Sequence, residues 1–274
     1  MLKQGNEDFT FRKKFRRALV RALAIGGGEF KKKICFVHIP KCGGNSVALA
    51  FINVVPLTRR VTWVHGPETR RAVSLIKTGV IDEAAFHDDT DRAEEVYALR
   101  RAMALVAMDL GHNYVGGHFV FDEDAYQNYQ DGYAWVTVLR DPVDRLISHY
   151  GEEKRSGFVS SSFEEYLATD MAKSHGAMLS RYLSGWSADM SPSKTHSVDR
   201  ALENLGRFDV VGFLDNMASF DEQISDITGK RITTNHSRPG RDKKPKLLPE
   251  TINTVRKLCA NDIKIYDQAI ERFA

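Results

Sequence analysis

The chain has 274 residues, with 39 Lys and Arg against 36 Asp and Glu, and 42% of its residues are hydrophobic. This is the composition of an ordinary soluble protein, and its length allows one large domain or two small ones. Because no run of about 18 apolar residues is present, we expect no membrane span. The N-terminus lacks the apolar core of a secretory signal, and the three cysteines match neither a disulfide framework nor a metal site. We therefore expect a reducing compartment, the cytoplasm by default.

Positive charge is concentrated at the start of the chain. Residues 1–33 hold ten Lys and Arg against three acidic residues, a net charge of +7, which leaves −4 for residues 34–274. The basic character therefore belongs to a leader, and the rest of the chain is net acidic. Nucleic-acid binding is disfavoured for this reason.

The leader itself has an amphipathic pattern over residues 9–24. Phe11, Phe15, Leu19 and Leu23 recur every four residues among basic ones, which predicts a short helix. Such a helix could lie on an anionic membrane or hold an acidic polymer. The alternative is a solvated helix docked on the domain by its apolar stripe.

Beyond the leader, short apolar runs alternate with helical patterns. We expect strands at residues 34–39, 114–119, 133–139 and 208–213. We expect helices at residues 46–51, 67–110, 143–150, 163–169, 176–184, 217–228 and 249–273. Alternating strands and helices predict a single three-layer α/β domain over residues 34–274, with a mainly parallel central sheet flanked by helices.

A glycine-bearing turn links the first strand to the first helix of this domain. It reads His38-Ile39-Pro40-Lys41-Cys42-Gly43-Gly44-Asn45-Ser46. Unpaired backbone N–H groups at a helix N-terminus form an anion site, which the helix dipole strengthens. Lys41 adds an ammonium group and Ser46 a hydroxyl, while the two glycines allow a phosphate to approach the backbone. The turn therefore predicts a phosphate-binding loop and a P-loop-like fold.

The loop differs from the nucleotide-binding pattern GxxxxGK[ST]. Lys41 precedes the glycines, and Asn45 stands where that pattern has its lysine. No acidic residue clearly ends a strand to hold the magnesium that kinases and NTPases require. For a ligand with less charge than a triphosphate, Lys41 and the backbone amides could suffice without a metal. A P-loop kinase-like phosphotransferase stays an alternative, which ATP binding and magnesium dependence would identify.

The loop resembles the 5′-phosphosulfate loop of carbohydrate sulfotransferases that use 3′-phosphoadenosine-5′-phosphosulfate (PAPS). The likeness is to the heparan sulfate and uronyl 2-O-sulfotransferase branch, whose bacterial relatives carry a similar HIPK-T-GG-T-S stretch. This chain departs from that stretch at Cys42 and Asn45. The resemblance implies PAPS as co-substrate, no metal, and donor contacts from Lys41, Cys42, Gly43, Gly44, Asn45 and Ser46.

Cys42 has an alternative interpretation as a nucleophile. A thiol at a helix N-terminus can have a lowered pKa. A nucleophile also needs an activating base, and no His–Asp pair lies near Cys42 in the sequence. We therefore expect Cys42 to bind rather than react.

A second segment, residues 136–150, carries Arg140 at a strand end and Ser148 in the following helix. The planar fork of an arginine binds phosphate oxygens in pairs. This segment closely resembles the 3′-phosphate motif of the same enzymes, which implies that Arg140 and Ser148 bind the 3′-phosphate that distinguishes PAPS from ATP. An internal ion pair of Arg140 is the structural alternative.

Transfer to a hydroxyl needs a base with a pKa near the working pH, and histidine suits this role. His118 follows two glycines at a predicted strand end, where it can face a cleft. His118 also follows a glycine in a Gly-His pair, and this pair resembles the one that carries the catalytic histidine in the 2-O-sulfotransferase branch. Our mechanistic hypothesis is direct in-line displacement, with His118 as the base while Lys41 and the loop amides stabilise the departing 5′-phosphate. The alternative is a loop histidine bonded to the backbone.

The acceptor side is less defined. Residues 235–246 form a basic loop whose Arg241 and Lys243, by the resemblance, cover the bound donor. A solvated charged loop is the alternative. We expect the acceptor to be a hydroxyl of a glycan. A third hypothesis is a protein that binds anionic glycans through the leader and this loop without catalysis.

Overall fold

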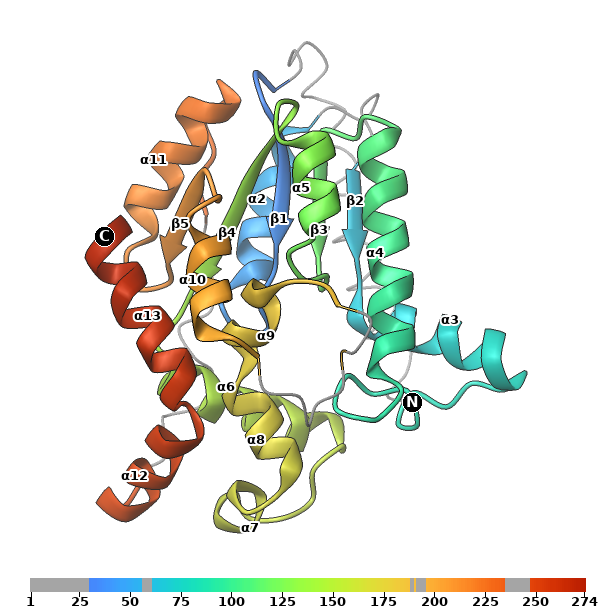
Figure 1. Cartoon of the computed structure of the whole chain (residues 1–274), viewed down its shortest axis with the longest axis vertical. Coiled ribbons are helices and arrows are strands. Elements are labelled where there is room, and N and C mark those ends of the chain that lie inside the picture. The colour runs from blue at the N-terminus through green and yellow to red at the C-terminus, as the bar shows by residue number, and fades with distance from the viewer. Residues whose placement is uncertain (1–29, 56–60, 188–189, 191–195, 235–246) are drawn as a thin grey trace, which may run out of the picture.

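The computed structural model describes residues 30–55, 61–187, 190, 196–234 and 247–274. These residues form a five-stranded sheet with helices on both faces (Figure 1). Every pair of neighbouring strands is parallel. The predicted three-layer α/β fold with a mainly parallel sheet is confirmed.

Two predicted features lie outside the described residues. They are the amphipathic leader helix at residues 9–24 and the basic loop with Arg241 and Lys243. At the boundary with the leader, Phe30 is buried in a hydrophobic cluster that also contains Ile34 and Phe36. Among the described residues, no helix combines the length and the apolar character needed to cross a membrane.

The strands are β1 (Lys33–Val37), β2 (Val61–Val64), β3 (Tyr114–Gly117), β4 (Tyr133–Leu139) and β5 (Val210–Phe213). Their order across the sheet is β2-β3-β1-β4-β5. Strands of a parallel sheet are covered on both faces and are therefore continuous apolar runs, which is why β1 and β4 could be predicted. β2 was not predicted, because three of its four residues are partly exposed and the run is short.

The helices in chain order are α2 (Gly44–Val54), α3 (Gly66–Thr78), α4 (Ala93–Asp109), α5 (Glu123–Tyr129), α6 (Pro142–Ser156), α7 (Phe163–Leu167), α8 (Asp170–Gly176), α9 (Met178–Ser184), α10 (Val198–Leu205), α11 (Met217–Thr228), α12 (Pro249–Leu258) and α13 (Ala260–Phe273). The prediction of one helical stretch at residues 67–110 is wrong. Gly79, with φ of 75°, ends α3, and α4 starts only at Ala93. The predicted closing helix is likewise two helices, which meet at Cys259.

Successive side chains of the strands point to opposite faces of the sheet and belong to two separate hydrophobic clusters. In β1, Cys35 and Val37 belong to a buried cluster with α4, α9, α10 and α13. Ile34 and Phe36 belong to a second cluster with α2 and α11. Burying each large apolar side chain stabilises the fold by about 1.5–3 kcal/mol. The two clusters fix the sheet between its helical layers.

The carboxyl ends of the strands meet α6 and its neighbours. All five strands run toward the end of the molecule that carries α6, α7 and α8 (Figure 1). α6 begins with Pro142 after Asp141, whose carboxylate accepts the Asp144 N–H at 2.9 Å. This cap is worth about 1 kcal/mol. In open parallel sheets, ligands bind outside the carboxyl ends of the strands, and the predicted phosphate loop lies there.

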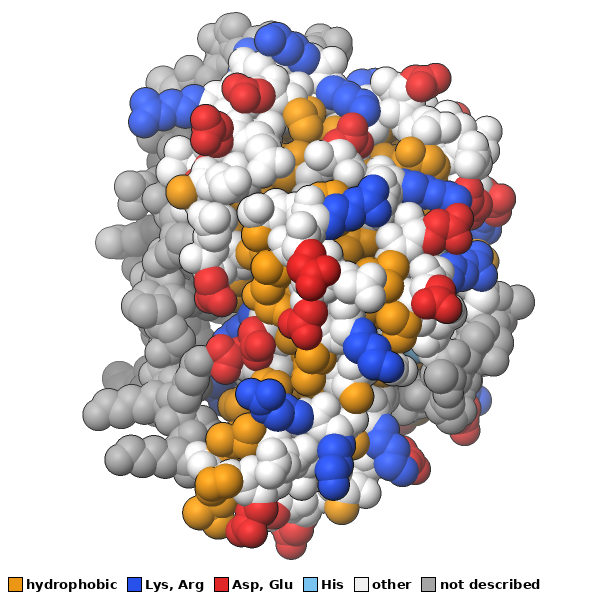
Figure 2. Space-filling view, turned by 60° about the vertical axis from the view of Figure 1, so that its left-hand side comes forward, with side chains coloured by type: hydrophobic (Ala, Val, Ile, Leu, Met, Phe, Trp, Pro, Cys, Tyr) orange, Lys and Arg blue, Asp and Glu red, His pale blue; other side chains and the backbone are white. Residues whose placement is uncertain are grey.

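Figure 2 shows the face that carries α11 and α13. Lys and Arg side chains are interspersed there with Asp and Glu, and the described residues in view form no continuous basic patch.

Candidate functional site

The turn after β1 leaves the N-terminus of α2 open to a ligand. Lys41 and Gly43 take left-handed backbone conformations, with φ of 69° and 77°. Among the described residues, the N–H groups of Gly43, Gly44 and Asn45 meet no acceptor, whereas the Ser46 N–H donates to the Gly43 carbonyl at 3.0 Å. A left-handed lysine is a strained conformation of the kind that clusters at ligand sites. Unpaired donors at a helix N-terminus favour an anion there.

Cys42 is turned into the core. Its thiol is fully buried, and its N–H donates to the Ile39 carbonyl at 3.3 Å. Burial raises the pKa of Cys42 to about 12. The thiol is therefore protonated at neutral pH, which argues against a nucleophile.

The second predicted segment reaches the same loop. β4 lies beside β1 in the sheet, and Arg140, which directly follows β4, donates from Nη1 to the Lys41 carbonyl at 3.2 Å. The Lys41 ammonium pairs with the Glu152 carboxylate at 3.2 Å. Glu152 lies one helical turn beyond Ser148 in α6, so both occupy one face of that helix. Lys41, Arg140 and the Ser148 face of α6 are thus brought together.

His118 lies at the end of the other neighbour of β1. It directly follows β3, and its N–H donates to the Val64 carbonyl at 3.0 Å. Its ring centroid is 4.5 Å from that of His38, the residue that opens the phosphate loop. The predicted base, Lys41 and the loop amides therefore lie at adjacent strand ends.

The protonation of His118 differs from the expectation. Burial and then the charge of Arg100 lower the pKa of His118 to about 3. Arg100 is itself fully buried and binds both oxygens of Asp88 at 2.8 Å. At pH 7 the imidazole is neutral and can accept a proton. In the free protein it is nevertheless a weaker base than expected, because its pKa lies well below the working pH.

Two neighbours of the site were not predicted. Glu152 lies four residues after Ser148, so a search along that helix face could have found it. Arg100 is 18 residues before His118 and is joined to the site only by tertiary packing. No sequence pattern signals that contact.

A group of possible metal ligands lies between α6, which carries His149 and Glu153, and α8, which carries His175. Ligand atoms of His149, Glu153 and His175 are within 4.8 Å of one another. Both ring nitrogens of His175 already have partners, Asp89 at 2.5 Å among them. Arg145 lies 3.3 Å from Nδ1 of His149 and adds a positive charge. These occupied nitrogens and the positive charge of Arg145 disfavour binding of a divalent cation, so we assign no metal to the group.

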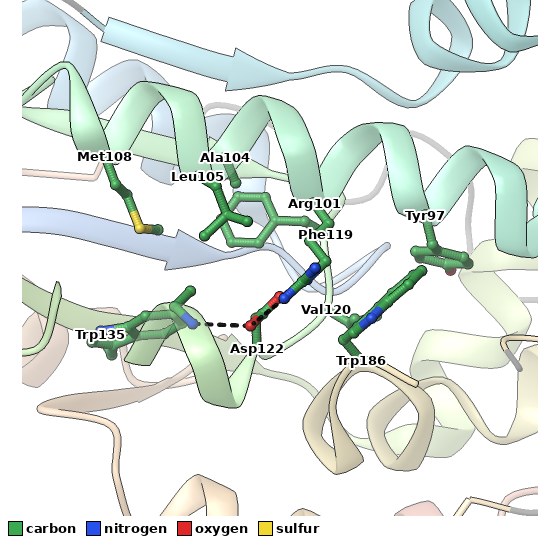
Figure 3. Close-up of a pocket in the computed structure, with 11 residues that line it drawn as sticks. Tyr97, Arg101, Ala104, Leu105, Met108, Phe119, Val120, Asp122, Trp135 and Trp186 are labelled. Carbon is green, nitrogen blue, oxygen red and sulfur yellow. Dashed lines mark hydrogen bonds and ion pairs between the residues drawn. The ribbon is translucent and has the colours of Figure 1, made fainter. Parts of the chain in front are cut away.

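A small pocket lies between α4 and the segment after β3 (Figure 3). Its wall includes Phe119 and Val120, which directly follow His118, and Trp186. The lining is mainly apolar, and its charged groups, Arg101 and Asp122, pair with each other. No residue of the phosphate loop lines this pocket, so it is separate from the anion site.

Fold and site together define a class of protein: a parallel α/β protein with unpaired N–H groups at the helix N-terminus that follows its first strand. No protein-family model and no curated protein matches the chain. Among solved structures, a crystal structure of a sulfotransferase from Alicyclobacillus acidocaldarius is similar over 89% of this chain and 97% of that chain. The identity is 18% and the TM-score 0.43. A similarity of this size carries no argument about activity, which must come from the site's own residues.

Proposed function

We propose that the protein is a sulfotransferase that moves a sulfuryl group from PAPS to a hydroxyl of a carbohydrate acceptor. The observation that carries this proposal is the hydrogen bond from Arg140 to the Lys41 carbonyl. It joins the two segments that resemble the 5′-phosphosulfate and 3′-phosphate motifs, which lie far apart in the sequence. An isolated anion loop would suit many phosphorylated ligands, whereas the pair suits a nucleotide with phosphates at both positions.

In this proposal the donor's two ends bind to different strand ends. The N–H groups of Gly43, Gly44 and Asn45, with the Ser46 hydroxyl and the Lys41 ammonium, hold the 5′-phosphosulfate. Arg140 and Ser148 hold the 3′-phosphate. Lys41 must exchange its contact with Glu152 for the donor. That exchange costs little, because the Glu152 side chain is 51% exposed.

The proposed chemistry is a direct in-line displacement. The acceptor oxygen attacks sulfur, the bond between sulfur and the 5′-phosphate oxygen breaks, and 3′-phosphoadenosine 5′-phosphate leaves. Lys41 and the loop amides stabilise the charge on that leaving group, and His118 takes the hydroxyl proton. Negative charge on the bound donor raises the pKa of His118 above its value in the free protein, which makes it a stronger base.

Thermal unfolding with three nucleotides tests this proposal. Adenosine 3′,5′-bisphosphate should stabilise the protein by about 2.7 kcal/mol at 100 times its Kd. AMP, which lacks the 3′-phosphate, and ATP with magnesium should give much smaller shifts at equal concentration. Equal shifts with all three would contradict the proposal, and a larger shift with ATP and magnesium would favour a phosphotransferase.

A further inference from the structure

His38 connects the phosphate loop to His118. It directly follows β1, and its N–H donates to the Gly117 carbonyl at 3.0 Å, which places it beside His118. Its ring lies 5.7 Å from that of Phe36 and 5.3 Å from that of Trp63, centroid to centroid. The side chain is only 5% exposed. By burial and stacking alone, His38 would be a core aromatic residue.

One edge of the His38 ring lies against the first residue of α2. A Cβ atom on Gly44 would overlap the Cδ2 and Nε2 atoms of His38, so only glycine admits the ring. The Gly44 N–H is one of the unpaired donors at this helix N-terminus. Nε2 therefore lies beside the place where the loop would hold an anion.

The other ring nitrogen is buried without a partner. Nδ1 of His38 is enclosed and meets no hydrogen-bonding group among the described residues. Leaving a buried polar atom unpaired costs free energy, and a phenylalanine would keep the stack without that cost. Packing therefore does not explain an imidazole at this position, whereas a ligand contact through Nε2 does.

We propose that His38 is a further donor-binding residue, whose Nε2–H donates a hydrogen bond to the 5′-phosphate end of the bound donor. This inference rests on the proposed function. With the hydrogen on Nε2, the enclosed Nδ1 carries only a lone pair. The ring is a neutral hydrogen-bond donor beside Lys41. It therefore orients the anion through a directional hydrogen bond, while Lys41 supplies the positive charge.

The surroundings of His38 keep it neutral. Burial, then His118 and Lys41, hold its pKa well below the usual range. Trp63 from β2 and Phe36 from β1 are uncharged neighbours. A neutral donor also avoids placing a second N–H on the enclosed Nδ1.

Three variants of His38 distinguish its two nitrogens. H38F keeps an aromatic ring and removes both nitrogens. H38Q places an amide nitrogen near the position of Nε2, and H38N places one near Nδ1. Calorimetric titration would measure the Kd of adenosine 3′,5′-bisphosphate and of adenosine 3′-monophosphate, which lacks the 5′-phosphate.

For the bisphosphate, we expect H38F and H38N to raise the Kd by about 10- to 100-fold, and H38Q to keep most of the affinity. The Kd of the 3′-monophosphate should be unchanged in all three. Unchanged bisphosphate affinity in H38F overturns the inference, as does an equal loss for both ligands, which indicates a structural role. Should H38F not fold, the contrast between H38Q and H38N decides. If the wild-type protein binds adenosine 3′,5′-bisphosphate no more tightly than adenosine 3′-monophosphate, the proposed function is overturned instead.

Discussion

The phosphate loop and a second group of polar residues differ in how their polar atoms are paired. The second group is a buried cluster around Asp89, formed with Ser174, His175 and Arg181. In the cluster, one oxygen of Asp89 contacts His175 at 2.5 Å, and the other accepts from Ser174 and from Arg181. In the loop, three backbone N–H groups meet no acceptor among the described residues. Both oxygens of the Asp89 carboxylate are thus paired, which stabilises the fold, whereas unpaired N–H groups at a helix N-terminus favour an anionic ligand. We therefore expect the cluster to stabilise the fold and the loop to bind a ligand.

The largest effect expected from this comparison is on stability. Asp89→Ala leaves Arg181 and His175 buried without their carboxylate, so it should lower the free energy of unfolding by about 3–5 kcal/mol in urea denaturation. Asp170→Ala is the matched control, because the Asp170 side chain is exposed and pairs with Lys173 on the surface. Its unfolding should be almost unchanged. Equal effects of the two substitutions would mean that the cluster is not structural.

The next effect is on turnover. His118→Ala should lower transfer of labelled sulfuryl groups from PAPS to a desulfated glycosaminoglycan by about 10²–10⁴-fold, because the acceptor loses its base. Affinity for adenosine 3′,5′-bisphosphate should stay near the wild-type value. Near-normal turnover in this variant would remove His118 from the mechanism.

A smaller effect concerns pH. The folded-state pKa of His118 is about 3, below its ordinary value, so the unfolded chain binds a proton there first as the pH falls. The free energy of unfolding should therefore decrease below about pH 6.5, by at most about 1.4 kcal/mol per pH unit from this residue. His118→Phe should make the decrease shallower in urea titrations at pH 7, 6 and 5. An unchanged slope would mean that His118 is not held neutral by the fold.

The smallest effect is expected at Cys42. Cys42→Ser preserves the backbone of the loop, so bisphosphate affinity and turnover should stay within about threefold of the wild type. Loss of turnover with affinity retained would instead identify a reactive thiol.

Much of the fold could be predicted because its elements are local patterns. β4 spans the predicted residues 133–139 and α11 the predicted residues 217–228. β2, α5, α8 and α10 were missed, since each has at most eight residues and is too short to repeat its pattern several times. In the site, the loop and the Arg140 segment are each contiguous and could be predicted. The lowered pKa of His118 could not, because it depends first on burial and then on Arg100, both of which come from tertiary packing.

In the proposed function, Arg140 makes the site specific for a nucleotide with both a 3′- and a 5′-phosphate. Its most direct measurement is the ratio of the Kd of AMP to that of adenosine 3′,5′-bisphosphate in wild-type protein and in Arg140→Ala. We predict that the wild type favours the bisphosphate by about 10- to 100-fold and that the substitution reduces the ratio to near one while AMP affinity is retained. An unchanged ratio in Arg140→Ala would contradict the account.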